Sequence, residues 1–360
     1  MLNTLVTILE FILAFGVLVF IHEFGHFIVA RLSGIEVEEF GFGYPPRIGK
    51  IFRFAGTDFT LNWIPFGGFC RMKGETGEDT EPGSFQAASP WKRLLTLLGG
   101  PFMNLLLGMI LIVIIYMRVG SSDPTRVMIT GVSDNSPAQT AQLQSGDIIT
   151  TIDGAKVDSL DTLFSLVQDH QGKETVLTIE RGTETLNVTL VPRTNPPEGQ
   201  GSIGISVSNP SIPVTFTQAV PAAALSTLDQ GAQLIMLPVK LIRGEIAPSS
   251  ARMVSVVGLY SMFDQVKAED TTQSQAVPSD AGMVTLSFIA ILSIALGYTN
   301  LLPIPALDGG HILFLIPELF FHKKVPPELE NRVHLIGYSL LMILMVVLII
   351  NDIFNPVVLK

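Results

Sequence analysis

Two histidines and a glutamate lie close together near the start of the chain, in the motif His22-Glu23-Phe24-Gly25-His26. Residues four apart in an α-helix share one face, so the two imidazoles can bind one ion. Neutral imidazole suits Zn²⁺, and Glu23 can reach a water on that ion and take its proton. The spacing therefore predicts metal-assisted hydrolysis, with His22 and His26 as ligands and Glu23 as catalytic base.

The residues around this motif make a metal site more convincing. H-E-x-x-H also arises by chance in soluble helices, but here it lies in an apolar stretch, residues 5–30, whose other ionisable group is Glu10. Three ionisable residues in a lipid-spanning helix cost several kcal/mol unless they are paired, hydrated or metal-bound. Packing alone is therefore a poor explanation of the motif.

A catalytic zinc ion takes three protein ligands and keeps an open position, so a third donor must come from elsewhere. The candidate is Asp308, in the segment 300–310 with the sequence N-L-L-P-I-P-A-L-D-G-G. Its prolines and glycines are expected to unwind the helix there, which membrane depth tolerates only inside protein or beside a wet cavity. Without the histidine pair, Asp-Gly-Gly would indicate an ordinary turn.

Two asparagines in apolar segments, Asn104 and Asn300, are candidate substrate-binding residues. Their amides could hydrogen-bond an unwound peptide backbone or an oxyanion, although interhelical packing is an equally ordinary use of Asn in membranes. His311 follows the glycines and could support the metal ligands from outside the site, although we expect an ordinary interfacial histidine. His334 has no partner pattern in the sequence, and Cys70 is expected to be a packing residue.

The composition sets the class of protein in which these residues act. The 360 residues are 48% hydrophobic and 15% charged, so part of the solvent is lipid. The net charge of −10, from 22 basic and 32 acidic residues, argues against nucleic acid as a partner. A single cysteine excludes a disulfide scaffold.

Four apolar segments are long enough to cross a bilayer core about 30 Å thick as helices. The first lacks the basic start and the cleavage site of a signal peptide, so we expect it to be retained. The predicted fold is a multi-span α-helical membrane protein, although one weak span could instead be a buried core helix. The predicted spans are residues 5–30 and 94–116, within a first membrane-core segment (residues 1–118), and residues 283–302 and 335–350, within a second membrane-core segment (residues 283–360).

Basic residues predict the side that each loop faces. The β-rich loop 31–93 carries eight of them and the loop 303–332 carries three, so both are expected to be cytoplasmic. The stretch 119–282 has nine basic and seventeen acidic residues and is expected outside, with both termini. The histidine motif and Asp308 then lie at similar depth, near the cytoplasmic ends of their spans.

Residues 125–193 have the pattern of a small α+β domain. A strand and tight turn over 146–154 precede a helix from Leu160, capped by Ser159, and then two strands, 175–181 and 185–191. The words S-P-A, L-Q-S-G-D and I-D-G closely resemble the bacterial PDZ pattern. PDZ domains accept an extended peptide as an added strand, and the alternative is a β-rich spacer without a ligand.

Residues 194–282 are predicted to form a linker followed by an amphipathic surface region. The segment 216–246 is expected to be helical in part, broken by Pro221 and Pro238. The segment 268–281 is expected to be a mobile polar loop.

Together these motifs resemble the site-2 protease family of intramembrane zinc metalloproteases, close to the bacterial regulator-of-sigma-E protease group, here with a single PDZ domain. Residues 22–26 and 300–311 match the two motifs of that family. Residues 99–104, G-G-P-F-M-N, are similar to the start of its second core helix, and residues 64–69 to its β-rich element beside the active site. The resemblance implies Zn²⁺ as cofactor and Asp308 as third ligand.

The resemblance also implies a biological role. It implies cleavage of transmembrane protein substrates, such as anti-sigma factors or signal-peptide remnants, in a bacterial inner membrane, after a first outside cut by a site-1 protease. The PDZ domain would restrict or recognise substrates, with an unknown peptide ligand. Some relatives carry two PDZ copies, and a Gly-Pro word usual after that domain is blurred at 255–259, which bears on substrate handling.

Two functions of other classes remain as alternatives. A membrane-tethered PDZ adaptor would carry an inactive or structural metal site with a closed set of four ligands. A transporter could use intramembrane histidines and acids as a relay, but the sequence shows no inverted repeat.

Overall fold

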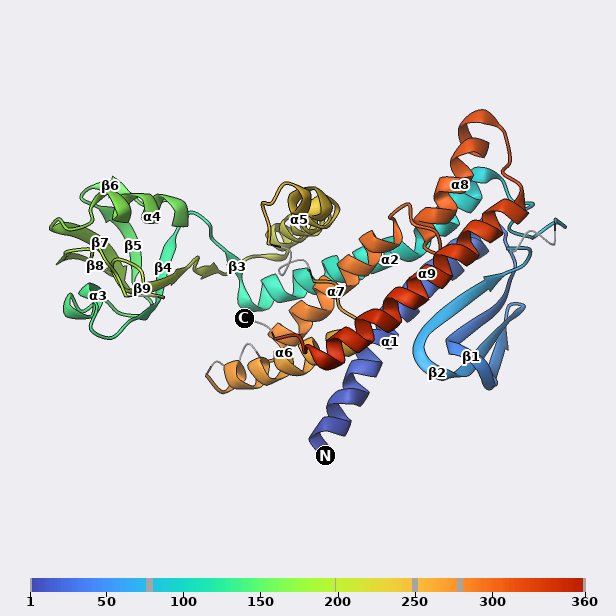
Figure 1. Ribbon diagram of the computed structural model, residues 1–360, viewed down its shortest axis with the longest axis horizontal. Helices are drawn as coiled ribbons and strands as arrows, with labels where there is room; N and C mark the ends of the chain where they lie inside the picture. Colours follow the sequence, from blue (N-terminus) through green and yellow to red (C-terminus); the bar gives the residue numbers. More distant parts are fainter. Residues whose placement is uncertain (1, 76–79, 198, 248–251, 277–280, 359–360) are drawn as a thin grey trace. The chain divides into compact units, whose positions relative to one another are not determined.

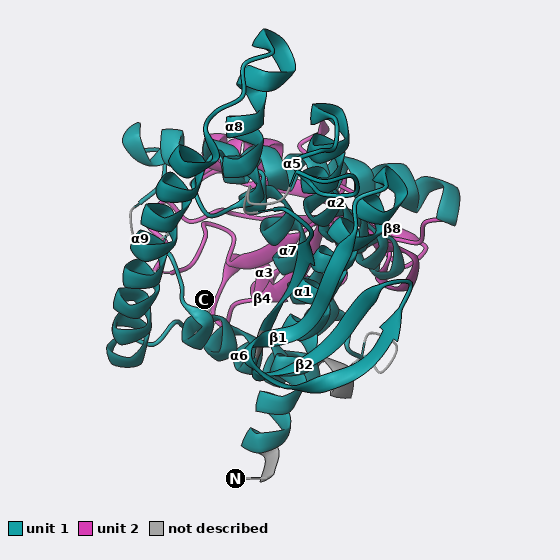
Figure 2. Cartoon of the chain, turned by 90° about the vertical axis from the view of Figure 1, so that its right-hand side faces the viewer, with its two compact units in different colours: residues 1–115, 216–360 teal, residues 116–215 magenta. Residues whose placement is uncertain are grey.

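A computed structural model describes residues 2–75, 80–197, 199–247, 252–276 and 281–358. The chain forms two compact units (Figure 2). The first, here called the membrane unit, comprises residues 1–115 and 216–360, and the second, the inserted unit, comprises residues 116–215. The inserted unit therefore interrupts the membrane unit in the sequence.

Helices make up most of the membrane unit. Four of the described helices are long and apolar enough to cross a membrane, as predicted. Three of them extend beyond the predicted spans because the helices continue into polar flanks, such as Lys92-Arg93 and Glu328, that an apolar window leaves out. The helices are α1 (Leu2–Ser33), α2 (Pro90–Val119, which ends in the inserted unit), α5 (Phe216–Ile242), α6 (Val256–Ala276), α7 (Met283–Asn300), α8 (Asp308–Phe321) and α9 (Pro327–Phe354).

Two long antiparallel strands, β1 (Val37–Phe54) and β2 (Thr57–Met72), lie beside α1 (Figure 1). Their register is not that of a simple hairpin, because residues 39–42 pair both with 58–61 and with 68–71. Residues 47–54 pair in turn with 57–62. The two strands thus bend into a curled sheet with the segment order 47–54, 57–62, 39–42, 68–72, in which 68–72 forms one edge.

An aromatic core fixes this sheet to the helix that carries the histidine motif. Phe20, Phe24 and Phe27 follow one face of α1, since their spacing of four and three residues matches the helical repeat. Phe40, which is 1% exposed, lies with its ring centroid 5.7 Å from those of both Phe20 and Phe27. The position of the sheet relative to the motif is therefore set by tight apolar packing.

Glycines allow α1 and α2 to approach closely beside the motif. A Cβ added to Gly25 would lie 2.2 Å from the carbonyl oxygen of Gly99, and one added to Gly99 would lie 2.6 Å from that of Gly25. Any side chain at either position would push the two backbones apart.

Two predictions for residues 194–282 are wrong. Helix α5 runs without a break through Pro221 and Pro238, because a proline removes one hydrogen bond and bends a helix without having to end it. The predicted polar loop 268–281 is helical as far as Ala276, and residues 277–280 lie outside the described residues. Tertiary contact explains this helix, since the buried Asp270 accepts hydrogen bonds from the Gly282 amide and the Thr285 hydroxyl.

The segment 303–332, predicted as a loop, contains helix α8. Residues 303–307 are not helical, as expected, but Gly309 and Gly310 belong to the first turn of α8 rather than to an unwound stretch. A Cβ added to Gly309 would lie 2.2 Å from the Leu302 carbonyl oxygen. The glycine pair therefore lets the start of α8 pack against the preceding loop.

The inserted unit is built on a sheet in the strand order β8-β7-β5-β4-β9, with β6 on β5. Ser159 caps α4 as predicted, accepting a hydrogen bond from the Thr162 amide. The unit extends past residue 193 because β9 pairs with β4. Its elements are β3 (Ser121–Ser122), β4 (Val127–Val132), α3 (Pro137–Thr140), β5 (Ile148–Ile152), β6 (Ala155–Lys156), α4 (Leu160–Asp169), β7 (Thr175–Arg181), β8 (Glu184–Leu190), β9 (Ile205–Ser208) and β10 (Ser211–Ile212).

Two features of the inserted unit matter below. Its ends are joined by a short ribbon in which β3 pairs with β10, Ser121 opposite Ile212. Its buried carboxylate, Asp147, accepts two hydrogen bonds of 2.7 Å from Arg181 and one of 2.9 Å from the Gln144 amide.

Candidate metal centre

Helix α1 presents the two histidines on one face, and both side chains are buried. His26 donates from Nδ1 to the Thr96 carbonyl oxygen of α2 at 2.8 Å. That bond fixes the ring and leaves the lone pair on Nε2. The Nε2 atoms of His22 and His26 lie 3.2 Å apart.

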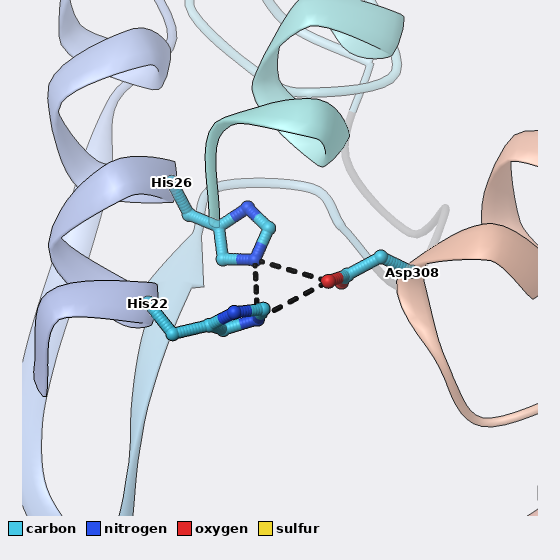
Figure 3. A group of neighbouring side chains, drawn as sticks. All are labelled: His22, His26 and Asp308. Atoms are coloured by element: carbon cyan, nitrogen blue, oxygen red, sulfur yellow. Dashed lines mark hydrogen bonds and ion pairs between the residues drawn. The ribbon is translucent and has the colours of Figure 1, made fainter. Parts of the chain in front are cut away.

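Asp308, the first residue of α8, completes the group (Figure 3). Its Oδ2 lies 3.1 Å from His22 Nε2 and 3.5 Å from His26 Nε2. Ligands at about 2.0–2.1 Å from a tetrahedral ion are about 3.3 Å from one another. The three predicted ligands therefore converge at the separations that one tetrahedral zinc ion requires.

Two further observations fit a metal ion. Asp308 Oδ2 is buried and has no hydrogen-bond partner among the described residues. A Cβ added to Gly100 would lie 2.3 Å from His26 Nε2 and 2.8 Å from His22 Nε2, so the absence of a side chain keeps the space beside both nitrogens clear. Two imidazole nitrogens and a carboxylate oxygen form a donor set that suits zinc.

Asn104 contacts the His22 ring at Nδ1, the nitrogen that faces away from the other two donor atoms. It is 1% exposed, and its amide Nδ2 is 3.3 Å from His22 Nδ1, while its Oδ1 has no partner among the described residues. Turning the amide over would bring its oxygen to His22 Nδ1, which could then donate a proton and keep Nε2 free. The geometry thus gives Asn104 a contact with a histidine ring that the sequence did not predict.

A cavity of about 510 Å³ opens beside the three donor atoms. Glu23 and Asn300 both line it, Asn300 from the end of α7. The edge segment of the curled sheet closes one side, and a Cβ added to Gly68 would lie 3.5 Å from Cγ of Glu23. All six predicted site residues therefore border one cavity.

The cavity also contains polar side chains that the sequence did not single out, Tyr44, Glu75 and Tyr338. They come from β1, from the residues after β2, and from α9. None of them belongs to a motif, and only the tertiary fold brings them together.

A buried histidine pair and an aspartate, contributed by separate helices beside a cavity that holds a glutamate, define a metal-dependent hydrolase set among apolar helices. The sequence model of peptidase family M50 matches residues 10–344. The chain belongs to this family. It is a zinc metalloendopeptidase of the site-2 protease type.

Relatives match along almost the full chain. A Clostridium acetobutylicum protein with a provisional zinc metalloprotease name is 33% identical over 96% of this chain and 97% of its own. The regulator of sigma-W protease RasP of Bacillus subtilis and the zinc metalloprotease RasP of Shouchella clausii are each 29% identical, over 96% of this chain and 98% of theirs.

One solved structure matches a portion of the chain. The PDZ domain of an SdrC-like protein of Listeria monocytogenes is 24% identical, covering 24% of this chain and 90% of that domain, with a TM-score of 0.21.

Proposed function

We propose that His22, His26 and Asp308 hold one Zn²⁺ and that Glu23 is the general base in hydrolysis of transmembrane segments. The observation that carries the proposal is the convergence of the three donor atoms, 3.1–3.5 Å apart, beside a cavity lined by Glu23. Three donors leave a fourth position open, which supports catalysis over the closed site of an adaptor.

The residues of this chain divide the chemistry among them. Zinc, when bound, acidifies a water to a pKa of about 7 and polarises the scissile carbonyl. Glu23 accepts the proton of the attacking water and returns it to the leaving amine. Thr96, through its carbonyl oxygen, holds the His26 ring with Nε2 free, and Asn104, with its amide turned so that the oxygen faces His22 Nδ1, would do the same for His22.

The substrate is proposed to bind as an extended strand. A transmembrane helix hides its carbonyls in internal hydrogen bonds, so it must unwind before attack. The edge segment 68–72 of the curled sheet borders the cavity and can pair with an unwound peptide by strand addition. Asn300 also lines the cavity and would hydrogen-bond the same backbone.

The cellular setting also belongs to the proposal. Single-span membrane proteins already cut outside the membrane, such as anti-sigma factors or signal-peptide remnants, are the proposed substrates. The Bacillus subtilis relative, a regulator of sigma-W protease, supports a link to sigma-factor control. Residues 125–193 act as a PDZ domain that selects them. The charge distribution supports an extracytoplasmic PDZ domain and termini, with loops 31–93 and 303–332 in the cytoplasm of a bacterium.

The role of Glu23 is tested by Glu23→Gln in the purified full chain. Cleavage of a single-span substrate should fall by about 10²–10⁴-fold, as expected for loss of a general base, while zinc content is unchanged. Glu10→Gln, on the same helix and outside the cavity, is the matched control and should cleave normally. Normal cleavage by Glu23→Gln would show that another group is the base.

A further inference from the structure

The loop before Asp308 has an unusual backbone conformation. Ala306, two residues upstream, has φ of 81°, in the left-handed region that a residue with a Cβ rarely adopts. The direction of the chain at Ala306 sets where Asp308 enters α8. An external contact is therefore needed to hold this conformation.

Helix α9 supplies that contact. His334, which is 4% exposed, accepts the Ala306 amide hydrogen at Nδ1 across 2.9 Å. About one turn further along α9, a Cβ added to Gly337 would lie 2.7 Å from the Pro305 carbonyl oxygen. Two successive turns of α9 thus press on the loop that leads to Asp308.

The same face of α9 also holds the chain after Asp308. The His311 ring stacks on that of His334, with centroids 3.7 Å apart and planes inclined by 15°. Nδ1 of His311 lies 3.0 Å from Oε1 of Glu330, one turn before His334 on α9. Asp308 is therefore bracketed by contacts to a single helix face.

We propose that His334 is a positioning residue for Asp308, acting through the Ala306 amide; the inference rests on the proposed metal site. Because Nδ1 accepts a hydrogen bond, His334 is neutral and carries its proton on Nε2. Its contribution is to hold the third ligand where the two imidazoles need it.

The ring geometry argues against a second metal ion at His311, Glu330 and His334, although donor atoms of these side chains lie within 4.8 Å of one another. The lone pairs of an imidazole lie in the plane of its ring. Two rings stacked almost in parallel cannot direct those lone pairs to one point. We therefore assign the cluster to positioning.

The test uses the full chain and measures zinc retention against a chelator as well as cleavage. His334→Leu removes the hydrogen-bond acceptor. Zinc affinity and kcat should both fall by about 10-fold or more, as when a group that orients a metal ligand is lost, while KM should change little. His334→Asn can place an amide oxygen near the position of Nδ1 and should restore most of both. His322→Asn, at the exposed residue after α8 whose left-handed backbone Asn tolerates, is the control.

A second variant tests the backbone argument. Glycine adopts positive φ freely, so Ala306→Gly should partly restore zinc retention in the His334→Leu background. Thermal unfolding of each variant checks that the fold persists. If folded His334→Leu retains zinc like the natural chain, or if Asn is no better than Leu, the positioning role is wrong.

Two comparisons distinguish failure of the positioning role of His334 from failure of the proposed metal site. If Asp308→Ala keeps its zinc, the metal site itself is wrong; if Asp308→Ala loses zinc and His334→Leu does not, only the positioning role fails. Zinc content should be about one ion per chain. Two ions, one of them lost in His334→Leu, would overturn the positioning role in favour of a second metal site.

Discussion

Asp308 in the membrane unit and Asp147 in the inserted unit are both largely removed from solvent, but their carboxylates differ in their hydrogen-bond partners. Asp147 is 1% exposed, and three hydrogen bonds, two of them from the permanent charge of Arg181, use both of its oxygens. Asp308 faces two imidazoles, which carry no fixed charge, and its Oδ2 has no hydrogen-bond partner among the described residues.

The difference separates a residue that stabilises the fold from one that we propose to bind a metal ion. A buried carboxylate is costly unless a cation or hydrogen-bond donors offset the loss of water. Arg181 does this for Asp147 within the chain. Asp308 has no comparable partner among the described residues, which fits its proposed role as a metal ligand.

The largest expected effect is that of Asp308→Ala. Zinc content should fall from about one ion per chain towards zero, and cleavage with it, because two imidazoles alone make a weak site. Metal analysis and a cleavage assay measure this. Hydrogen exchange in β5 and β7 of the inserted unit should not change, and a change there would mean that the two carboxylates are not independent.

Gly100→Ala should have the next largest effect. The new methyl group would lie 2.3 Å from His26 Nε2, so either the ring must move or the metal position is filled, and zinc affinity should fall by at least about 10-fold. Gly16→Ala on α1, where an added Cβ meets no described atom within 4 Å, is the control. Normal zinc binding by Gly100→Ala would show that this space is not needed.

Asp147→Asn should act on stability and not on zinc. It removes a charge from the bonds with Arg181, and the free energy of unfolding of the inserted unit should fall by about 2 kcal/mol. Denaturant unfolding followed by hydrogen exchange measures this loss, with the exposed Asp169→Asn as control. Loss of zinc in Asp147→Asn would contradict the comparison.

The stability of the inserted unit at acid pH should depend on the Asp147 carboxylate. Burial alone would raise the pKa of Asp147, but the hydrogen bonds from Arg181 and the Gln144 amide hold it below its usual value. The stabilisation is therefore complete above the unfolded pKa of about 3.9 and is lost as the pH falls through the lower folded value. Unfolding of the inserted unit between about pH 5 and pH 2 should show this dependence, and Asp147→Asn should flatten it.

Arg181→Lys should have the smallest effect. Lysine keeps the charge but cannot form two parallel bonds, so about 1 kcal/mol of the stabilisation should be lost. A loss as large as that of Asp147→Asn would mean that the forked geometry, more than the charge, stabilises Asp147.

The sequence predicted the portions of the site that depend on local spacing. His22, Glu23 and His26 follow from the helical repeat within an apolar segment, and Asp308 follows from resemblance and an unwound stretch. The role of His334 was not predictable, because its partner is a backbone amide in a distant loop and leaves no pattern in the sequence. The β-rich character of residues 31–93 was predicted, but the order of the curled sheet was not, since residues 39–42 pair with two segments through long-range contacts.

The sequence also failed to predict that α5 and α6 are continuous helices. Proline content and polar composition are local signals, and they favoured a break and a loop. Tertiary contacts stabilise the helix at the end of α6, since Asp270 accepts hydrogen bonds from residues at the start of α7. Tertiary contacts override local propensity where an element is held from outside.

The β3–β10 ribbon has a consequence for how such a chain can evolve. Because Ser121 lies opposite Ile212, the polypeptide leaves and returns at neighbouring points, as in domains that tolerate insertion and permutation. A module bounded in this way can be exchanged, duplicated or deleted by recombination at two adjacent junctions. If the inserted unit selects substrates as proposed, selectivity would change in one genetic event while the hydrolytic machinery is inherited intact.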